Sequence, residues 1–191
     1  MITRWFTADQ HFGHFNIIKF CDRPFVDVDE MNEVMVARWN EVVKPDDVVY
    51  HLGDIAMGDK AERLEYISRL NGHIILYPGN HDSCWEGWSK YSPAKEQLYL
   101  DAGIGAIAQG TDYMDIGDCT VALNHFPYYG DSGEEDRFNW YRPVDNGDWL
   151  IHGHIHEIRK VEARMINVGV DVWDFYPVHE STIIEIIKEA S

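Results

Sequence analysis

Short apolar runs alternate with longer amphipathic segments along the first half of the chain. The runs are rich in β-branched and aromatic residues and predict strands at Ile2–Ala8, Val48–Tyr50 and Ile74–Tyr77. Helical spacing of apolar residues predicts one helix that begins after Asp27 and stops before Pro45, and another at Asp59–Leu70. A strand, a helix and a second strand at this spacing form a right-handed βαβ unit. The pattern therefore predicts an α/β protein with parallel neighbouring strands.

The second half of the chain changes to short strands separated by turn residues. A further helix is predicted at Pro93–Asp101 and stops at Gly103. Strands are then predicted at Ala106–Gln109, Tyr113–Ile116, Cys119–Asn124, Trp149–Ile151, Met165–Val168 and Thr182–Ile187. Turn residues such as Gly117 and Asp118 favour antiparallel neighbours in this region. No repeat or linker divides the chain, so residues 1–191 are expected to form a single domain.

Charge and cysteine content narrow the classes of function. Acidic residues outnumber basic ones 33 to 16, and the formal net charge is −17. Such a surface does not attract nucleic acid at long range, so no stable nucleic-acid partner is expected. No apolar run reaches membrane-spanning length, so no membrane association is expected. The cysteines form no CxxC motif and the N-terminus lacks a signal-peptide pattern, which predicts a cytoplasmic location and leaves the oligomeric state open.

Polar side chains follow five of the predicted strands, at the point where each strand ends. The clusters are Asp9 with His11, Asp54, Asn80 with His81, His125, and His154 with His156. Side chains two residues apart in an extended chain point the same way, so such pairs can face one spot. In α/β sheets, ligands bind beyond the carboxyl ends of the strands. The five clusters are therefore expected to converge on one site, although each alone is also compatible with a polar loop.

The chemistry of these side chains indicates two divalent metal ions. Apart from His81, the set offers two carboxylates, one amide oxygen and four imidazoles, with no thiolate. Mixed nitrogen and oxygen ligation suits Mn, Fe, Zn, Ni or Co better than Mg or Ca alone, and Mn is expected to activate best. Two ions about 3.5–4 Å apart can share a bridging carboxylate, clamp a phosphoryl group and supply a bridging hydroxide as nucleophile. They would also make the site locally positive within an acidic protein.

The order of the clusters also resembles a known family. The blocks Asp9-x-His11, Gly53-Asp54, Gly79-Asn80-His81-Asp82, His125 and Gly153-His154-Ile155-His156 resemble the calcineurin-like metallophosphoesterases, and look most like its small bacterial and phage members. The resemblance implies a four-layer α/β/β/α sandwich of two mixed sheets flanked by helices. It implies one ion held by Asp9, His11, Asp54 and His156, and a second held by Asp54, Asn80, His125 and His154. It also implies that His81 contacts the substrate phosphate and protonates the leaving oxygen.

One departure from the family pattern bears on the substrate. The protein-phosphatase branch continues Gly-Asp-x-x-Asp-Arg-Gly, whereas Gly53-Asp54 is followed here by Ile55-Ala56-Met57-Gly58. The aspartate that orients the catalytic histidine and the arginine that grips phosphate are missing at those positions, which argues against a phosphoprotein substrate. Within the family, a histidine at the position of His81 accompanies diesterase activity. The resemblance thus favours phosphodiesters slightly.

A loop of about twenty residues after His125 joins two ligand clusters and is expected to border the site. Its aromatic and arginine side chains suit base stacking and phosphate binding. The candidate substrate contacts are Trp140, Tyr141 and Arg142 in this loop, with His14 and Arg23 nearer the N-terminus. Each of these residues is equally compatible with a structural role.

The leading hypothesis is a two-metal phosphoesterase that hydrolyses phosphodiester bonds, cyclic nucleotides included, or phosphomonoester bonds of a small substrate such as a nucleotide. Two alternatives stay open. One is a nuclease acting on single-stranded nucleic acid, against which the acidic charge counts. The other is a metal-bound regulatory module without turnover, against which the complete set of ligands and His81 count.

Overall fold

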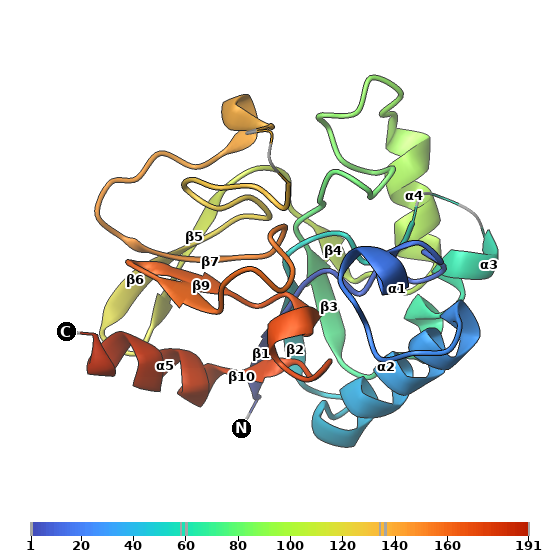
Figure 1. The fold of residues 1–191 in the computed structure, drawn as a ribbon, viewed down its shortest axis with the longest axis horizontal. Helices are drawn as coiled ribbons and strands as arrows, with labels where there is room; N and C mark the ends of the chain where they lie inside the picture. Colours follow the sequence, from blue (N-terminus) through green and yellow to red (C-terminus); the bar gives the residue numbers. More distant parts are fainter. Residues whose placement is uncertain (1, 58, 60, 134, 136, 191) are drawn as a thin grey trace.

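Two five-stranded sheets face one another, with helices flanking them (Figure 1). The computed structural model describes residues 2–57, 59, 61–133, 135 and 137–190, and the statements below concern these residues. In spatial order the first sheet contains β10 (Val178–His179), β1 (Arg4–Thr7), β2 (Val48–His51), β3 (His73–Leu76) and β4 (Ala106–Ile107). The second contains β5 (Asp112–Ile116), β6 (Cys119–Leu123), β7 (Trp149–His152), β9 (Met165–Asn167) and β8 (Val161–Glu162).

Both sheets are mixed. The strands β1 to β4 run parallel to one another, and β10 runs antiparallel to β1. In the second sheet β6, β7 and β9 are parallel, while β5 and β8 run antiparallel to their neighbours. The expected α/β architecture of two mixed sheets flanked by helices is therefore confirmed, as is the parallel pairing predicted from the βαβ pattern.

Four helices cover the side of the first sheet that faces away from the second (Figure 1). They are α1 (Ile17–Phe20), α2 (Val28–Val42), α3 (Ala61–Leu64) and α4 (Pro93–Asp101). The longest, α2, begins where the sequence predicted, because the Asp27 carboxylate accepts a hydrogen bond from the backbone N–H of Glu30 at 2.9 Å. Its buried side chains Met31, Met35 and Trp39 join the core on this side of the sheet.

The strand predicted at Thr182–Ile187 is wrong, because these residues belong to helix α5 (Glu180–Glu189). The run of isoleucines suggested a strand by composition. The buried positions, however, are Ile183 and Ile187, which are four residues apart and lie on one helical face. These two side chains pack into the core between the sheets, together with Phe6 and Val121. The helical period of the apolar positions thus outweighed the strand propensity of β-branched residues.

The helix predicted at Asp59–Leu70 is shorter than expected. The structure has α3 over Ala61–Leu64 and a separate 3₁₀ helix over Ile67–Arg69, while residue 60 lies outside the described residues. Leu64, Ile67 and Leu70 are nevertheless buried, as the pattern indicated. Their spacing of three residues matches a 3₁₀ turn, in which side chains at i and i+3 eclipse.

The ends of the central strands are level, which sets the position of the site. Thr7 of β1 pairs with His51 of β2, and His51 pairs with Leu76 of β3. The backbone N–H of Ala8 then donates to the carbonyl of Val168 in the second sheet at 3.1 Å. The two sheets therefore meet at the carboxyl ends of β1 and β9, and the loops that follow the strands of both sheets are brought together there.

Candidate metal centre

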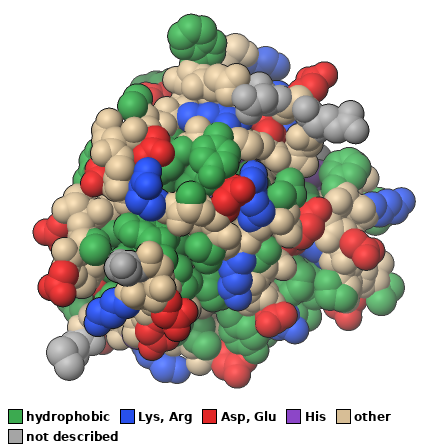
Figure 2. All heavy atoms as spheres, turned by 60° about the vertical axis from the view of Figure 1, so that its left-hand side comes forward, with side chains coloured by type: hydrophobic (Ala, Val, Ile, Leu, Met, Phe, Trp, Pro, Cys, Tyr) green, Lys and Arg blue, Asp and Glu red, His purple; other side chains and the backbone are tan. Residues whose placement is uncertain are grey.

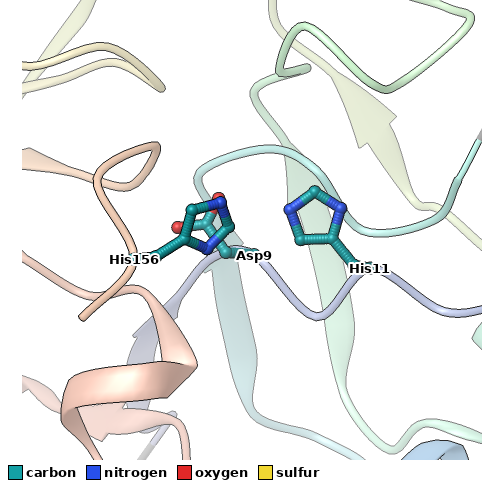
Figure 3. A group of neighbouring side chains, drawn as sticks. All are labelled: Asp9, His11 and His156. Atoms are coloured by element: carbon teal, nitrogen blue, oxygen red, sulfur yellow. The ribbon is translucent and has the colours of Figure 1, made fainter. Parts of the chain in front are cut away.

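The seven side chains proposed as metal ligands come together at these strand ends. They are Asp9 and His11 after β1, Asp54 after β2, Asn80 after β3, His125 after β6, and His154 and His156 after β7. Potential ligand atoms of Asp9, His11 and His156 lie within 4.8 Å of one another (Figure 3). Those of Asp9, Asp54 and His125 also lie within 4.8 Å of one another. The two groups share Asp9 and form one continuous cluster.

Asp54 lies between two groups of histidines. Its Oδ2 is 3.6 Å from Nε2 of His11 and 3.6 Å from Nε2 of His125. Ligands that bind one ion at about 2.0–2.2 Å stand roughly 3–3.6 Å from each other. A single carboxylate oxygen thus has neighbours at ligand spacing on both sides, which is the arrangement that a bridging ligand requires.

Hydrogen bonds fix which nitrogen of two histidines is left for a metal. The Nδ1 of His125 lies 2.7 Å from the carbonyl oxygen of Leu52, so Nε2 faces inward, 3.3 Å from Oδ1 of Asn80. For His154 the arrangement is reversed, because its Nε2 lies 3.2 Å from the Asp131 carboxylate and Nδ1 is left. Partners of this kind set the tautomer and the ring orientation of metal-binding histidines. Asp131 carries no motif, and the sequence did not reveal this role.

A buried ion pair positions His156. Its Nδ1 lies 3.1 Å from Oδ2 of Asp171, and Asp171 in turn accepts two hydrogen bonds from Arg23, at 2.7 and 2.9 Å. Burial opposes protonation of His156, but its hydrogen bond with Asp171 still holds the pKa of His156 well above its ordinary value. Burial likewise opposes ionisation of Asp171, yet Arg23 and His156 lower its pKa to about 2. Asp171 follows β9 as the metal ligands follow their strands, a signal that the sequence offered and that was missed.

The structure corrects the prediction that Arg23 contacts the substrate phosphate. Its side chain is fully buried, and besides Asp171 it donates to the carbonyl oxygen of Asp9 at 2.7 Å and to that of Gln10 at 3.1 Å. Arg23 therefore lies beneath the ligand cluster and braces the segment that carries Asp9. An arginine four residues before a helix cap is typical of a surface position, and only the fold shows that the Asp171 carboxylate pairs with it.

Replacement of Asp171 by asparagine is expected to weaken metal binding by about 10- to 100-fold, because loss of the carboxylate frees the His156 ring. Titration of the metal-free protein with Mn²⁺, followed by electron paramagnetic resonance, measures this. Glu33→Gln is the matched control, since it breaks a two-fold hydrogen-bonded pair with Arg69 at the surface. Equal Mn²⁺ affinity in wild type and Asp171→Asn, with the fold intact by circular dichroism, would contradict the positioning role.

Asp82 holds two of the ligand loops against each other. Its carboxylate accepts hydrogen bonds from the backbone N–H groups of Asp54 at 2.7 Å, Gly79 at 2.9 Å and Ile55 at 3.1 Å. Burial, and then the charge of Asp54, raise the pKa of Asp82 well above its ordinary value. Asp82 therefore fixes the backbone of the loops after β2 and β3.

Five of the seven proposed ligands have a left-handed backbone. The φ angles are 64° at Asp9, 55° at His11, 56° at Asp54, 74° at His154 and 49° at His156. Non-glycine residues seldom adopt this region, and each such residue costs on the order of 1 kcal/mol or more. Strain of this kind persists where the surrounding structure enforces it, and it concentrates at functional sites. Its concentration on the ligands supports a site built for binding.

Glycines allow the ligand loops to approach one another closely. A Cβ atom at Gly79 would lie 2.2 Å from Oδ1 of Asp54, and one at Gly153 would lie 2.8 Å from Oδ2 of Asp9. Any larger residue would displace a carboxylate from the cluster. The glycines that accompany the motifs are therefore explained by contact with the ligands.

The cluster contains buried polar atoms that a cation would satisfy. Among the described residues, Oδ1 of Asp9 and both ring nitrogens of His11 are buried without a hydrogen-bond partner. Unsatisfied buried groups are costly and therefore rare in proteins. Burial raises the pKa of Asp9 to about 7 and lowers that of His11 well below its ordinary value, which leaves the imidazole neutral, as a ligand must be. The residues present thus fit divalent cations.

Two further histidines line a cavity of about 530 Å³ beside the cluster. The ring centroid of His81 lies 5.2 Å from that of His11 and 5.8 Å from that of His14. The backbone N–H of His81 donates to Oδ1 of Asp54 at 2.8 Å, which fixes its position relative to the proposed bridge. Burial, and then His81 and Arg23, lower the pKa of His14 to about 4. Both side chains are placed where a substrate could meet them.

The three candidate contacts in the long loop do not line this cavity. Trp140 is 97% exposed. The ring of Tyr141 packs edge-on against Trp85, with 4.6 Å between centroids, and the side chain of Arg142 is buried 3.8 Å from Asp131. Tyr141 and Arg142 therefore match the packing role that the sequence also allowed. Trp140 would need a movement of the loop to reach a substrate.

Comparison with known proteins agrees with this geometry. The family model for calcineurin-like phosphoesterase matches residues 2–158. The chain is 35% identical over 184 residues to the gene 66 protein of Mycobacterium phage L5, covering 91% of this chain and 88% of that one. It is 32% identical over 191 residues to the uncharacterized protein MJ1445 of Methanocaldococcus jannaschii, covering 95% and 89%. The solved structure of the protein of unknown function AQ665 from Aquifex aeolicus matches with a TM-score of 0.75 and 27% identity, over 97% of this chain and 100% of that one.

The family match extends over every ligand-bearing loop, from the end of β1 to the loop after β7. A strand-end cluster suited to divalent cations, two facing mixed sheets and this match lead to one assignment: the chain belongs to the calcineurin-like phosphoesterases, which hydrolyse phosphoesters with divalent metal ions.

Proposed function

We propose that this protein is a two-metal phosphoesterase that hydrolyses phosphodiester or phosphomonoester bonds of small substrates, nucleotides and cyclic nucleotides included. The observation that supports two ions is the position of Asp54, whose Oδ2 is 3.6 Å from Nε2 of both His11 and His125. One ion would be held by Asp9, His11, Asp54 and His156. The other would be held by Asp54, Asn80, His125 and His154.

The ions best suited to this set are Mn, Fe, Zn, Ni or Co, with Mn expected to activate best. When bound, such ions stabilise the charge of the phosphoryl transition state and turn water into a nucleophile near neutral pH. The protein supplies the remaining steps. His81 faces the cavity beside the cluster and would donate a proton to the leaving oxygen, and His14 lies beside it as a second substrate contact.

The alternative of a nuclease has less support. The chain carries a formal charge of −17, and on the face in Figure 2 basic and acidic side chains are interspersed without a continuous basic stripe. Backbone contacts to nucleic acid require such a stripe. Steeply salt-dependent binding to a single-stranded oligonucleotide would restore the nuclease hypothesis.

The location and the domain organisation are part of the same proposal. The cysteines Cys21, Cys84 and Cys119 are free, which supports the reducing environment of the cytoplasm. None of the described helices is long and apolar enough to cross a membrane. We treat residues 1–191 as a single domain, because the site draws its residues from both sheets.

Removal of metal is expected to abolish hydrolysis of bis-p-nitrophenyl phosphate, and Mn²⁺ or a similar transition ion is expected to restore it. The proposed ligand set contains no thiolate, and no other nucleophile constellation is evident in the sequence. The measurement is the rate after EDTA treatment and after addition of each ion, with metal content determined by elemental analysis. Full activity in verified metal-free protein would refute the metal-dependent mechanism. Metal binding without turnover of any phosphoester would favour the regulatory module.

A further inference from the structure

The cavity beside His81 is much larger than a phosphate group requires. Its volume of about 530 Å³ falls in the range of pockets that enclose small organic ligands. One part of its lining comes from α1 and the residues that flank it, and another from the part of the long loop around Arg137. A substrate whose phosphoryl group lies at the metal centre would therefore have its leaving group in this cavity.

The wall formed by α1 is apolar. Ile17 is buried and lines the cavity, and next to it Phe20 is 70% exposed. The Phe20 ring meets the edge of His14, with 6.2 Å between centroids and an interplanar angle of 80°. Most of the phenyl surface is thus left for another flat group at the mouth of a polar site. Aromatic faces bind bases by stacking, which tolerates different bases.

The rim of the cavity is acidic. Glu135 and Glu157 line it, and among the described lining residues the one arginine is Arg137. The guanidinium of Arg137 is already engaged, because its Nη2 donates to Oδ1 of Asp131 at 2.9 Å. The outer part of the cavity therefore repels a negative group, whereas the metal centre attracts one.

We propose that this cavity binds the non-phosphoryl part of the substrate as a flat, uncharged aromatic group that stacks on Phe20. Glu135 and Glu157 select against a substrate that carries a second phosphate there. The proposal deepens the proposed function, on which it rests for the position of the phosphate, and it names a class: aromatic phosphoesters, such as those of a nucleoside, with a single phosphate. It also assigns the stacking role to Phe20, whereas the sequence suggested Trp140 or Tyr141 for this role.

The stacking role is tested by calorimetric titration of the Mn²⁺-loaded protein with AMP and with inorganic phosphate. AMP is expected to bind at least tenfold more tightly than phosphate. Phe20→Ala should remove about tenfold of AMP affinity and leave phosphate affinity unchanged, while Phe20→Trp should retain the affinity for AMP. Phe15→Ala is the matched control, because Phe15 is 54% exposed on the same segment but does not line the cavity.

The charge selection is tested with adenosine 3′,5′-bisphosphate, which adds one phosphate to AMP. The wild type is expected to bind it about fivefold less tightly than AMP at low salt, and added NaCl should narrow the difference. The double variant Glu135→Gln/Glu157→Gln should abolish the difference. Glu185→Gln/Glu189→Gln changes the net charge equally on the exposed face of α5 and should not.

The outcomes separate this inference from the proposed function. If bis-p-nitrophenyl phosphate is not hydrolysed but AMP binds in a manner that depends on Phe20, the pocket assignment stands and the enzymatic proposal fails. If the diester is hydrolysed but AMP binds no more tightly than phosphate, the pocket assignment is overturned. Equal losses of AMP affinity in Phe20→Ala and Phe15→Ala would also overturn it.

Discussion

Alanine in place of Asp54 is expected to remove both metal ions and to lower kcat/KM on bis-p-nitrophenyl phosphate by roughly 10³-fold or more. The Asp54 carboxylate oxygen lies 3.6 Å from Nε2 of His11 and from Nε2 of His125, so its loss affects both halves of the cluster. The charge that two ions bring to the phosphoryl group accounts for several kcal/mol of transition-state stabilisation. The decisive measurement is the ratio of metal to protein by elemental analysis.

The comparison variant is His125→Ala, which removes a residue from one side of Asp54 and should mainly empty one site. Asp118→Ala removes a carboxylate from an exposed turn and should leave both the metal content and the rate unchanged. Two ions retained per chain in Asp54→Ala would rule out the bridging role. Equal metal loss in Asp54→Ala and His125→Ala would show that the two sites do not fill independently.

Replacement of His81 by alanine is expected to keep both ions and to lower kcat in proportion to how much the leaving oxygen needs a proton. p-Nitrophenolate leaves readily without one, whereas the alkoxide of a nucleoside does not. The loss should therefore be about 10²- to 10⁴-fold on a dinucleoside monophosphate and much smaller on bis-p-nitrophenyl phosphate. It should appear in kcat, since the proton is transferred in the transition state.

The comparison of the two leaving groups separates proton donation from simple contact with the phosphate. Equal losses on both leaving groups, with both metals retained, would show that His81 positions the phosphate. The acid would then have to be sought at His14, whose ring centroid lies 5.8 Å from that of His81.

The cluster could be predicted from the sequence because each member follows a strand. Parallel strands that end level bring such residues together whatever lies between them, and Asp9, Asn80 and His154 needed no further information. Partners distant in the sequence escaped prediction. Asp171 is 148 residues from Arg23, and although it follows a strand as the ligands do, its pairing with Arg23 and His156 is visible only in the fold.

The predictions that failed relied on the types of residue present and gave too little weight to their periodicity and position. Isoleucines near the C-terminus suggested a strand, although the burial of Ile183 and Ile187 follows a helix. The aromatic residues of the long loop suggested base stacking at Trp140, which the structure leaves 97% exposed, whereas Phe20 lines the cavity from a four-residue helix that no pattern indicated. Side-chain type can be read from a sequence, but the direction in which a loop residue points depends on contacts that form only on folding.

The left-handed backbone at five of the ligands limits how this site can be copied or changed. A designer who transplanted the same two aspartates and three histidines onto ordinary extended loops would obtain the right donor atoms aimed in the wrong directions. Mutations that arise in evolution face the same constraint. A β-branched residue in place of Asp9 or Asp54 would remove a ligand and would also disfavour the φ of about 60° that the loop requires. Asparagine tolerates that conformation and keeps one oxygen donor, so it is the least disruptive exchange at these two positions. The metal centre therefore depends on the backbone conformation of these loops as much as on the identity of the side chains.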